Sequence, residues 1–119
     1  MEINLTIREI LARESSVVAA IILDKDGIVV AEESKSGDRR AQELAIEYAT
    51  VMKQILKVTD YLNVGNLEEI LVYTEKSIIV IRLITRDYYL ILITNTEGNI
   101  GKAKYLAKLA GERLEKEFK

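Results

Sequence analysis

Two aspartates stand one residue apart where an apolar run ends, in the stretch AAIILDKDGIVVAEE over residues 19–33. Carboxylates in this position can act as a phosphoryl-transfer nucleophile or as ligands for a hard metal ion. The same residues, Asp24-Lys25-Asp26-Gly27, are also typical of a hairpin turn, because glycine adopts a positive φ without steric cost. The segments around them decide between these chemistries.

Neither the phosphatase chemistry nor a calcium loop fits the residues after Asp24. A haloacid dehalogenase-like phosphatase needs its nucleophile strand in a parallel sheet, with a lysine and further acids from later strands, whereas here the next strand pairs straight back. An EF-hand loop counted from Asp24 would place Ile28 and Lys35 where oxygen ligands are required. We therefore interpret Asp24 and Asp26 as residues that shape and solvate a turn.

The composition narrows the chemistry further. The chain has no His and no Cys, which excludes Ser-His-Asp and Cys-His nucleophile systems and nearly all zinc sites. A net charge of -2 gives no basic footprint for nucleic acid. The longest apolar run, residues 17–23, is too short to span a bilayer, and the N-terminus lacks the layout of a signal peptide. We expect one cytoplasmic domain over residues 1–119, with no catalytic or metal-ligating residues, no nucleic-acid partner and no membrane insertion.

Hydrophobic spacing predicts the elements that position the turn. A first helix carries Ile3, Ile7, Ile10 and Leu11 at helical spacing, with Thr6 and Glu9 as a capping box. Strands follow over 17–23 and 28–31, a loop over 34–38, and a long helix from about 38 to 62 that residues 63–66 end. Three more strands over 69–74, 77–85 and 88–94 form a meander, and a last helix runs from the turn at 96–99 to the C-terminus.

This order predicts an α/β (α+β) sandwich, α-β-β-α-β-β-β-α, with a five-stranded antiparallel sheet. Strand 17–23 is apolar at every position, as expected for a strand covered on both faces. The strands over 77–85 and 88–94 are also strongly apolar. Helices are therefore expected on both faces of the sheet.

Four stretches in this order resemble the roadblock/dynein light chain domain family: VVAAIILDKDGIVVAEE, AQELAIEYATVMKQILKV, LEEILVYTEKSIIVIRLITRDYYLILITN and EGNIGKAKYLAKLAGERLEKEF. The resemblance implies a roadblock or profilin-like fold and a homodimer that pairs through the third strand and the second helix. It also implies a platform or regulator for small Ras-like GTPases, without a cofactor or catalysis of its own. One bacterial member stimulates GTP hydrolysis without inserting an arginine.

The residues of the long helix are consistent with a dimer, and the alternative is that a small protein simply has a wide apolar face. Apolar side chains on the long helix fill an arc of roughly 180°, wider than the stripe of about 100° that one sheet contact needs. The third strand would otherwise be an exposed apolar edge, and such edges are normally blunted or paired. The predicted dimer interface comprises Leu44, Tyr48, Val51, Met52, Ile55, Leu71, Val72 and Tyr73.

The resemblance implies partner docking on the opposite face of the long helix, which carries Glu43, Glu47, Thr50, Gln54 and Tyr61; the alternative is an ordinary solvated face. Tyr61 is its strongest candidate, because exposed aromatic residues are enriched at interfaces. Arg39 or Arg40 could serve as an arginine finger, but the resemblance argues against that role. Three hypotheses remain: a homodimeric GTPase regulator or scaffold, a structural adaptor that leaves nucleotide hydrolysis unchanged, and, as the weakest, a small enzyme that uses carboxylates.

Overall fold

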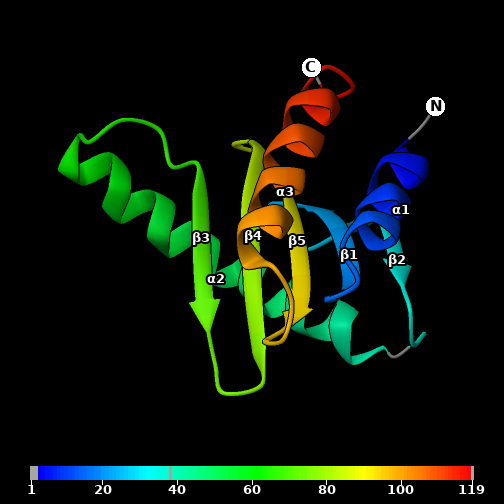
Figure 1. Cartoon of the computed structure of the whole chain (residues 1–119). Helices are drawn as coiled ribbons and strands as arrows, with labels where there is room; N and C mark the ends of the chain where they lie inside the picture. Colours follow the sequence, from blue (N-terminus) through cyan, green and yellow to red (C-terminus); the bar gives the residue numbers. More distant parts are fainter. Residues whose placement is uncertain (1–2, 38, 119) are drawn as a thin grey trace.

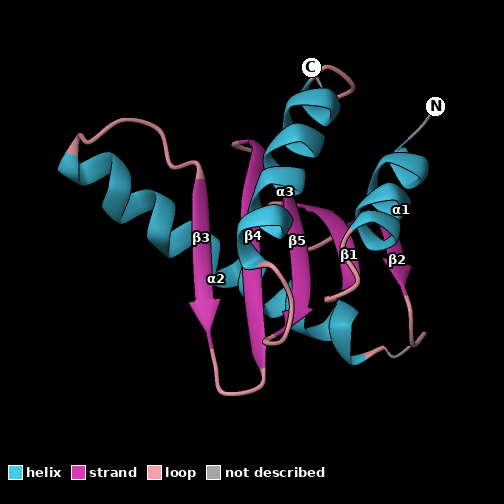
Figure 2. Ribbon diagram, in the orientation of Figure 1, coloured by secondary structure: helices cyan, strands magenta, loops and turns pink. Residues whose placement is uncertain are grey.

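The computed structural model describes residues 3–37 and 39–118. One antiparallel sheet has the strand order β2-β1-β5-β4-β3 (Figure 1). In chain order the elements are α1 (Ile3–Arg13), β1 (Val17–Asp24), β2 (Val29–Ser34), α2 (Arg40–Leu62), β3 (Glu69–Tyr73), β4 (Ser77–Thr85), β5 (Tyr88–Asn95) and α3 (Ile100–Glu115). The predicted fold class is confirmed, including helices on both faces: α1 and α3 cover one face and α2 the other (Figure 2).

Strand β1 shows why the sheet needs two helical layers. Ala20 and Ile22 face the α1–α3 layer, and Ile21 and Leu23 face α2. All four are fully buried. Alternate side chains of a strand point to opposite faces, so an entirely apolar strand requires cover on both. The most central strand is β5, which pairs with both β1 and β4.

The turn between β1 and β2 confirms the hairpin interpretation. The Asp24 carboxylate accepts hydrogen bonds from the backbone N–H groups of Asp26, at 2.9 Å, and Ile28, at 3.0 Å. Gly27 has a φ of 84°, in the left-handed region where glycine is favoured. The Asp24 carboxylate therefore stabilises the turn by binding its backbone N–H groups.

Several predicted boundaries differ from the structure. Helix α1 already includes Thr6, so Thr6 and Glu9 lie inside the helix and form no capping box at its start. Strand β2 continues to Ser34. Helix α2 begins at Arg40, and the predicted start near residue 38 falls outside the described residues. Helix α3 ends at Glu115, and Phe118 reaches the core beyond it by stacking on Tyr88, with ring centroids 4.2 Å apart.

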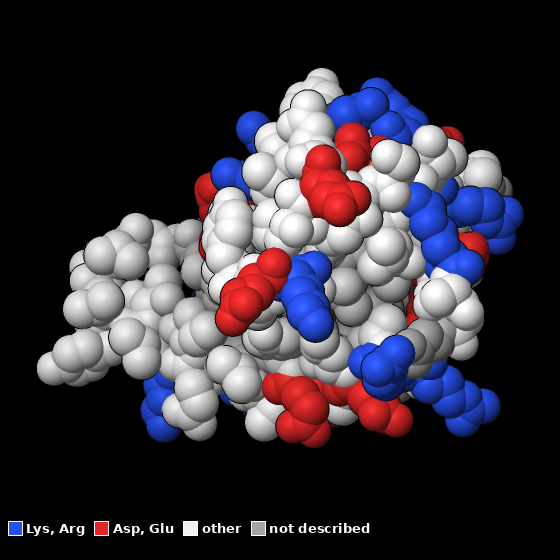
Figure 3. All heavy atoms as spheres, turned by 60° about the horizontal axis from the view of Figure 1, so that its bottom comes forward, with Lys and Arg blue, Asp and Glu red and all other residues white. Residues whose placement is uncertain are grey.

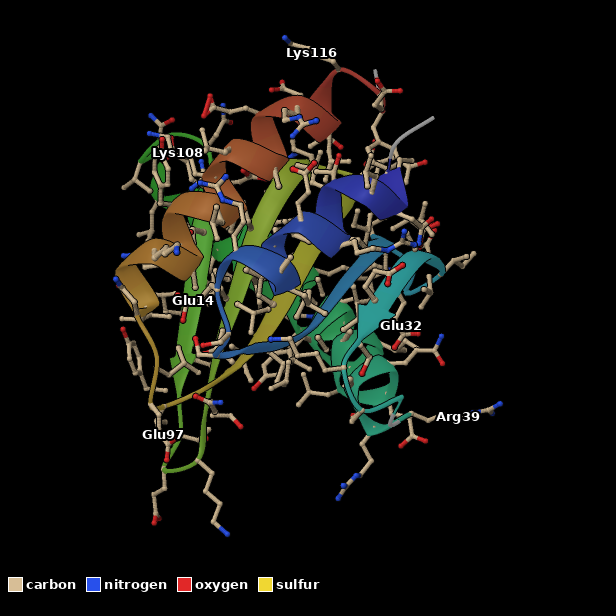
Figure 4. The ribbon with its side chains drawn as sticks, turned by 45° about the vertical axis from the view of Figure 1, so that its right-hand side comes forward. Glu14, Glu32, Arg39, Glu97, Lys108 and Lys116 are labelled. Carbon is tan, nitrogen blue, oxygen red and sulfur yellow. The ribbon has the colours of Figure 1, made fainter. Side chains whose placement is uncertain are left out.

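A buried carboxylate joins the end of α1 to the start of α3. Glu14 accepts hydrogen bonds from the Ser16 hydroxyl at 2.6 Å and from the backbone N–H of Asn99 at 3.2 Å. Asn99 in turn caps α3 by accepting from the N–H of Lys102. Gly98 makes this contact possible, because a Cβ there would overlap the Ser16 side chain. Figure 4 shows Glu14 between the two helices.

An ion pair anchors the C-terminal part of α2. The Arg86 guanidinium, in the turn between β4 and β5, donates to both carboxylate oxygens of Asp60, at 3.2 and 2.8 Å. Asn63 then ends the helix in the left-handed conformation, with a φ of 55°. Bidentate arginine–carboxylate pairs fix geometry better than single contacts do. This pair therefore holds the overhanging end of α2 to the sheet.

Part of the loss of folding stability at acid pH should come from protonation of Glu14. The hydrogen bonds from Ser16 and Asn99 lower the pKa of Glu14 below its ordinary value. A carboxylate with a lowered folded-state pKa contributes stability above the unfolded pKa, about 4.3, which is lost as the pH falls through the folded value. Glu14→Gln should therefore flatten the acid limb of a urea-unfolding series from pH 7 to pH 2. The exposed Glu97→Gln should retain that limb, and an unchanged limb in Glu14→Gln would contradict the assignment.

Loss of the Arg86–Asp60 pair should loosen one end of α2. We expect Arg86→Gln to speed backbone hydrogen exchange in the last two turns of α2, while the first turns keep the wild-type rate. Hydrogen–deuterium exchange read by mass spectrometry measures this difference. Arg113→Gln, which breaks the longer contact to Glu9 at 3.5 Å, is the control and should leave α2 unchanged. Equal exchange in α2 for both variants would show that the pair does not anchor it.

Candidate functional site

Helix α2 carries a second apolar stripe beside the one that it buries. The buried stripe packs beneath the sheet and consists of Ala45, Ala49, Met52 and Leu56. The second stripe repeats at alternating spacings of four and three residues, and consists of Leu44, Tyr48, Val51, Ile55, Val58 and Leu62. Val51, Val58 and Leu62 are 49%, 57% and 60% exposed. Such a heptad-like stripe is typical of a helix that pairs with another helix.

The structure divides the predicted interface residues of α2. Leu44, Tyr48, Val51 and Ile55 lie on the second stripe, hereafter the α2 stripe. Met52 has no exposed surface and belongs to the core beneath the sheet. Leu62 continues the α2 stripe in the last turn, and extending the four-and-three spacing along the sequence would have found it.

Strand β3 forms an open edge of the sheet. Within the described residues it pairs only with β4. Leu71 packs toward the α1–α3 layer, Val72 toward the α2 layer, and Tyr73 is 62% exposed. Helix α2 crosses behind the sheet and projects past β3 (Figure 1). The open edge and the α2 stripe are therefore available on the same side of the molecule.

The opposite edge of the sheet is blunted. The pairing of β1 with β2 contains a bulge, since the register shifts between Ile22 and Leu23. The edge strand β2 also carries Glu32 and Glu33, and Arg8 of α1 binds Glu33 at 3.2 Å. Bulges and charged side chains are common means of preventing edge-to-edge pairing. Only the β3 edge is a favourable pairing surface among the described strands.

The predicted docking residues share the outer face of α2. Glu43, Glu47, Thr50, Gln54 and Tyr61 are all exposed there. Tyr61 is 88% exposed. In Figure 3 the projecting end of the molecule at the left, which is the C-terminal end of α2 in Figure 1, is mostly uncharged. Exposed Val58, Leu62 and Val64 lie in this region and adjoin Tyr61 along the chain.

The two arginines at the start of α2 do not converge on a phosphate-sized site. Both are exposed, and Figure 4 shows Arg39 pointing away from the body of the protein. Arg39 borders a hollow whose other sides include Glu32 and Glu33. Acidic neighbours disfavour an anion there.

A hollow of about 390 Å³ lies between the C-terminal half of α2 and two turns of the sheet. Its lining residues are Lys25, Lys53, Leu56, Lys57, Asp60, Arg86, Asp87 and Tyr89. Tyr89 is fully buried, and burial together with the charge of Asp87 raises the pKa of its hydroxyl. Hydrophobic spacing in the sequence gives no signal for this hollow, because its residues come from α2 and from two separate turns.

The described residues contain neither a metal cluster nor a membrane helix. No group of three or more His, Cys, Asp or Glu side chains in this part of the chain could hold a metal ion. None of the described helices is long and apolar enough to cross a bilayer. Three other surfaces of the described residues are exposed: the α2 stripe, the β3 edge and the outer face of α2.

Comparisons with solved structures agree with this fold. The chain superposes on MglB of Myxococcus xanthus with a TM-score of 0.88 at 14% identity, over 99% of this chain and 95% of that one. It matches the gliding protein MglB of Thermus thermophilus with a TM-score of 0.86 at 19% identity, over 97% and 87%. For MglC of Myxococcus xanthus the TM-score is 0.70 at 26% identity, over 98% and 99%. No curated protein matches the chain in sequence.

A family model gives the family directly. The Roadblock/LC7 domain model matches residues 3–112, from the first helix into the last. The chain therefore belongs to the Roadblock/LC7 domain family.

Proposed function

We propose that the protein is a cytoplasmic homodimer that regulates or scaffolds a small Ras-like GTPase and has no catalysis of its own. The observation that carries the proposal is the α2 stripe, an apolar surface that the chain's own sheet covers only in part. Exposed apolar stripes of this kind mark sites of protein association. Family membership supports the GTPase context, and the fold shared with MglB agrees with it.

A second copy of the chain fits the exposed surfaces best. Pairing β3 with its twin across a two-fold axis would continue the sheet and satisfy the backbone groups of both edges. The same axis would bring two α2 helices together, so that Val51 and Ile55 meet their equivalents. The half-buried side chains of Ile70 and Val72 would lie under the joined helices and lose their remaining exposure. One symmetric interface thus accounts for both the stripe and the edge.

The dimer would present two copies of the outer face of α2 to a partner. That face carries carboxylates, a hydroxyl and an amide, with an aromatic side chain at its end. It offers no arginine, so an effect on hydrolysis would come from ordering the GTPase's own groups rather than from a charge inserted at the phosphate. The lack of an arginine there is equally compatible with an adaptor that binds a partner and leaves hydrolysis unchanged.

A charge on the α2 stripe should disrupt the dimer. Val51→Lys would bring two ammonium groups together at the two-fold axis, and unpaired buried charges of this kind cost several kcal/mol. We expect the dimer Kd to rise by at least about 100-fold, measured by sedimentation equilibrium. Val51 is half-exposed in one chain, so the variant should fold. Gln54→Lys adds the same charge on the outer face and should remain dimeric, and a monomeric wild-type protein would refute the interface.

GTPase binding should depend on Tyr61. The tagged protein is used as bait in native extract loaded either with a GTP analogue or with GDP. We expect a small GTPase to be enriched among the captured proteins in the extract that contains the analogue. Tyr61→Ala should weaken binding of the purified GTPase by about tenfold or more, as truncation of an aromatic anchor does. Tyr105→Ala, at an exposed tyrosine of α3, should not. If the dimer speeds single-turnover GTP hydrolysis by the bound GTPase, the protein is a regulator. If the GTPase binds and its hydrolysis rate is unchanged, the protein is an adaptor. Capture of no GTPase in either nucleotide state would reject both GTPase roles.

A further inference from the structure

The hollow beside the C-terminal half of α2 contains a buried hydroxyl without a partner. Tyr89 rises from β5 among the core residues of the α2 layer. Within the described residues its hydroxyl is the one buried side-chain polar atom that makes no hydrogen bond. Buried tyrosine hydroxyls are almost always paired. Since Tyr89 also lines the hollow, a group entering the hollow can supply the missing acceptor.

One of the cations around the hollow has no carboxylate partner. Four cationic side chains line the hollow, and three carboxylates, those of Asp60, Asp87 and Asp26, lie in or beside it. Three of the cations have carboxylate partners: Lys25 with Asp87 at 3.3 Å, Lys53 with Asp26 at 3.1 Å, and Arg86 with Asp60 at 2.8 Å. Among the described residues, no ion pair involves Lys57. Its ammonium group is therefore free to bind a ligand.

The available groups select the chemistry of that ligand. A protonated phenol and an ammonium group can both donate hydrogen bonds, and a tyrosine hydroxyl, with an ordinary pKa of about 10, is protonated at neutral pH. An oxyanion suits both donors, because its oxygens accept hydrogen bonds and its negative charge strengthens the bond from the ammonium group. We infer that this hollow is an oxyanion-binding site, in which the Tyr89 hydroxyl and the Lys57 ammonium group bind a phosphate or carboxylate group.

The site is contained within one chain. All of its lining residues come from α2, the β1–β2 turn, the β4–β5 turn and the start of β5. It lies apart from the β3 edge, and none of the α2 stripe residues lines it. Oxyanion binding therefore does not require the dimer or a GTPase, and the Val51→Lys protein should retain it. A failed dimer or GTPase experiment would leave this inference standing, and the reverse also holds.

Titration with inorganic phosphate at constant ionic strength tests the site. We expect saturable shifts of the backbone amides of residues 53–60 and 86–89 in ¹H–¹⁵N spectra, together with a rise in Tm that sodium chloride does not reproduce. Tyr89→Phe and Lys57→Gln should each weaken phosphate binding by at least about tenfold, the loss expected for a charge-assisted hydrogen bond. The controls Tyr105→Phe and Lys108→Gln change the same residue types on α3 and should bind like the wild type.

A parallel titration with acetate separates the two ligand forms. Saturation by phosphate alone indicates a phosphate site, and saturation by acetate alone indicates a carboxylate site. Without any anion, Tyr89→Phe should be at least as stable as the wild type, because it removes a hydroxyl that lacks an acceptor. No saturable shift with either anion would overturn the inference. Equal anion binding by Tyr89→Phe and the wild type would also overturn it, because the hydroxyl would then not contact the anion. A Tyr89→Phe protein that is destabilised without anion would overturn it too, because the hydroxyl would then already be satisfied by water.

Discussion

Helix α2 has more apolar surface than one face of one sheet can cover. The association surfaces of the molecule depend on this excess. Its buried stripe packs on the sheet through small residues, Ala45 and Ala49, which bring the helix close. The neighbouring stripe then lies at the margin of this contact, with some of its side chains half-buried and others exposed. The C-terminal end of α2 also projects beyond β3 (Figure 1). A long helix on a small sheet thus favours association over burial within one chain.

The two edges of the sheet differ: the β2 edge is protected against pairing, whereas the β3 edge is open. This difference determines on which side of the molecule a second chain can bind. A bulge and two glutamates protect β2, where α1 also adds a cation bound to Glu33. Strand β3 lacks a bulge and keeps a regular register with β4. A second chain would therefore be guided to the edge that lies beside the exposed part of α2. Pairing of backbone groups and burial of side chains would then act at the same place.

The anchoring of α2 connects the association surface to the hollow. Asp60 and Arg86 hold the helix end and also form part of the wall of the hollow. Neighbouring positions on α2 therefore serve different surfaces: Lys57 faces the hollow, whereas Val58 belongs to the α2 stripe. With 3.6 residues per turn, successive side chains of a helix point in different directions.

Local pattern was sufficient for the element order, the Asp24–Gly27 hairpin and the two-faced burial of β1, because periodicity and turn chemistry act over a few residues. It also found most of the α2 stripe. It could not separate Met52 from its exposed neighbours, since burial depends on how the helix is rotated against the sheet. The end of α3 and the stacking of Phe118 on Tyr88 depended likewise on packing. The hollow around Tyr89 needed the folded chain, because only tertiary contacts bring α2 and two distant turns around one hydroxyl.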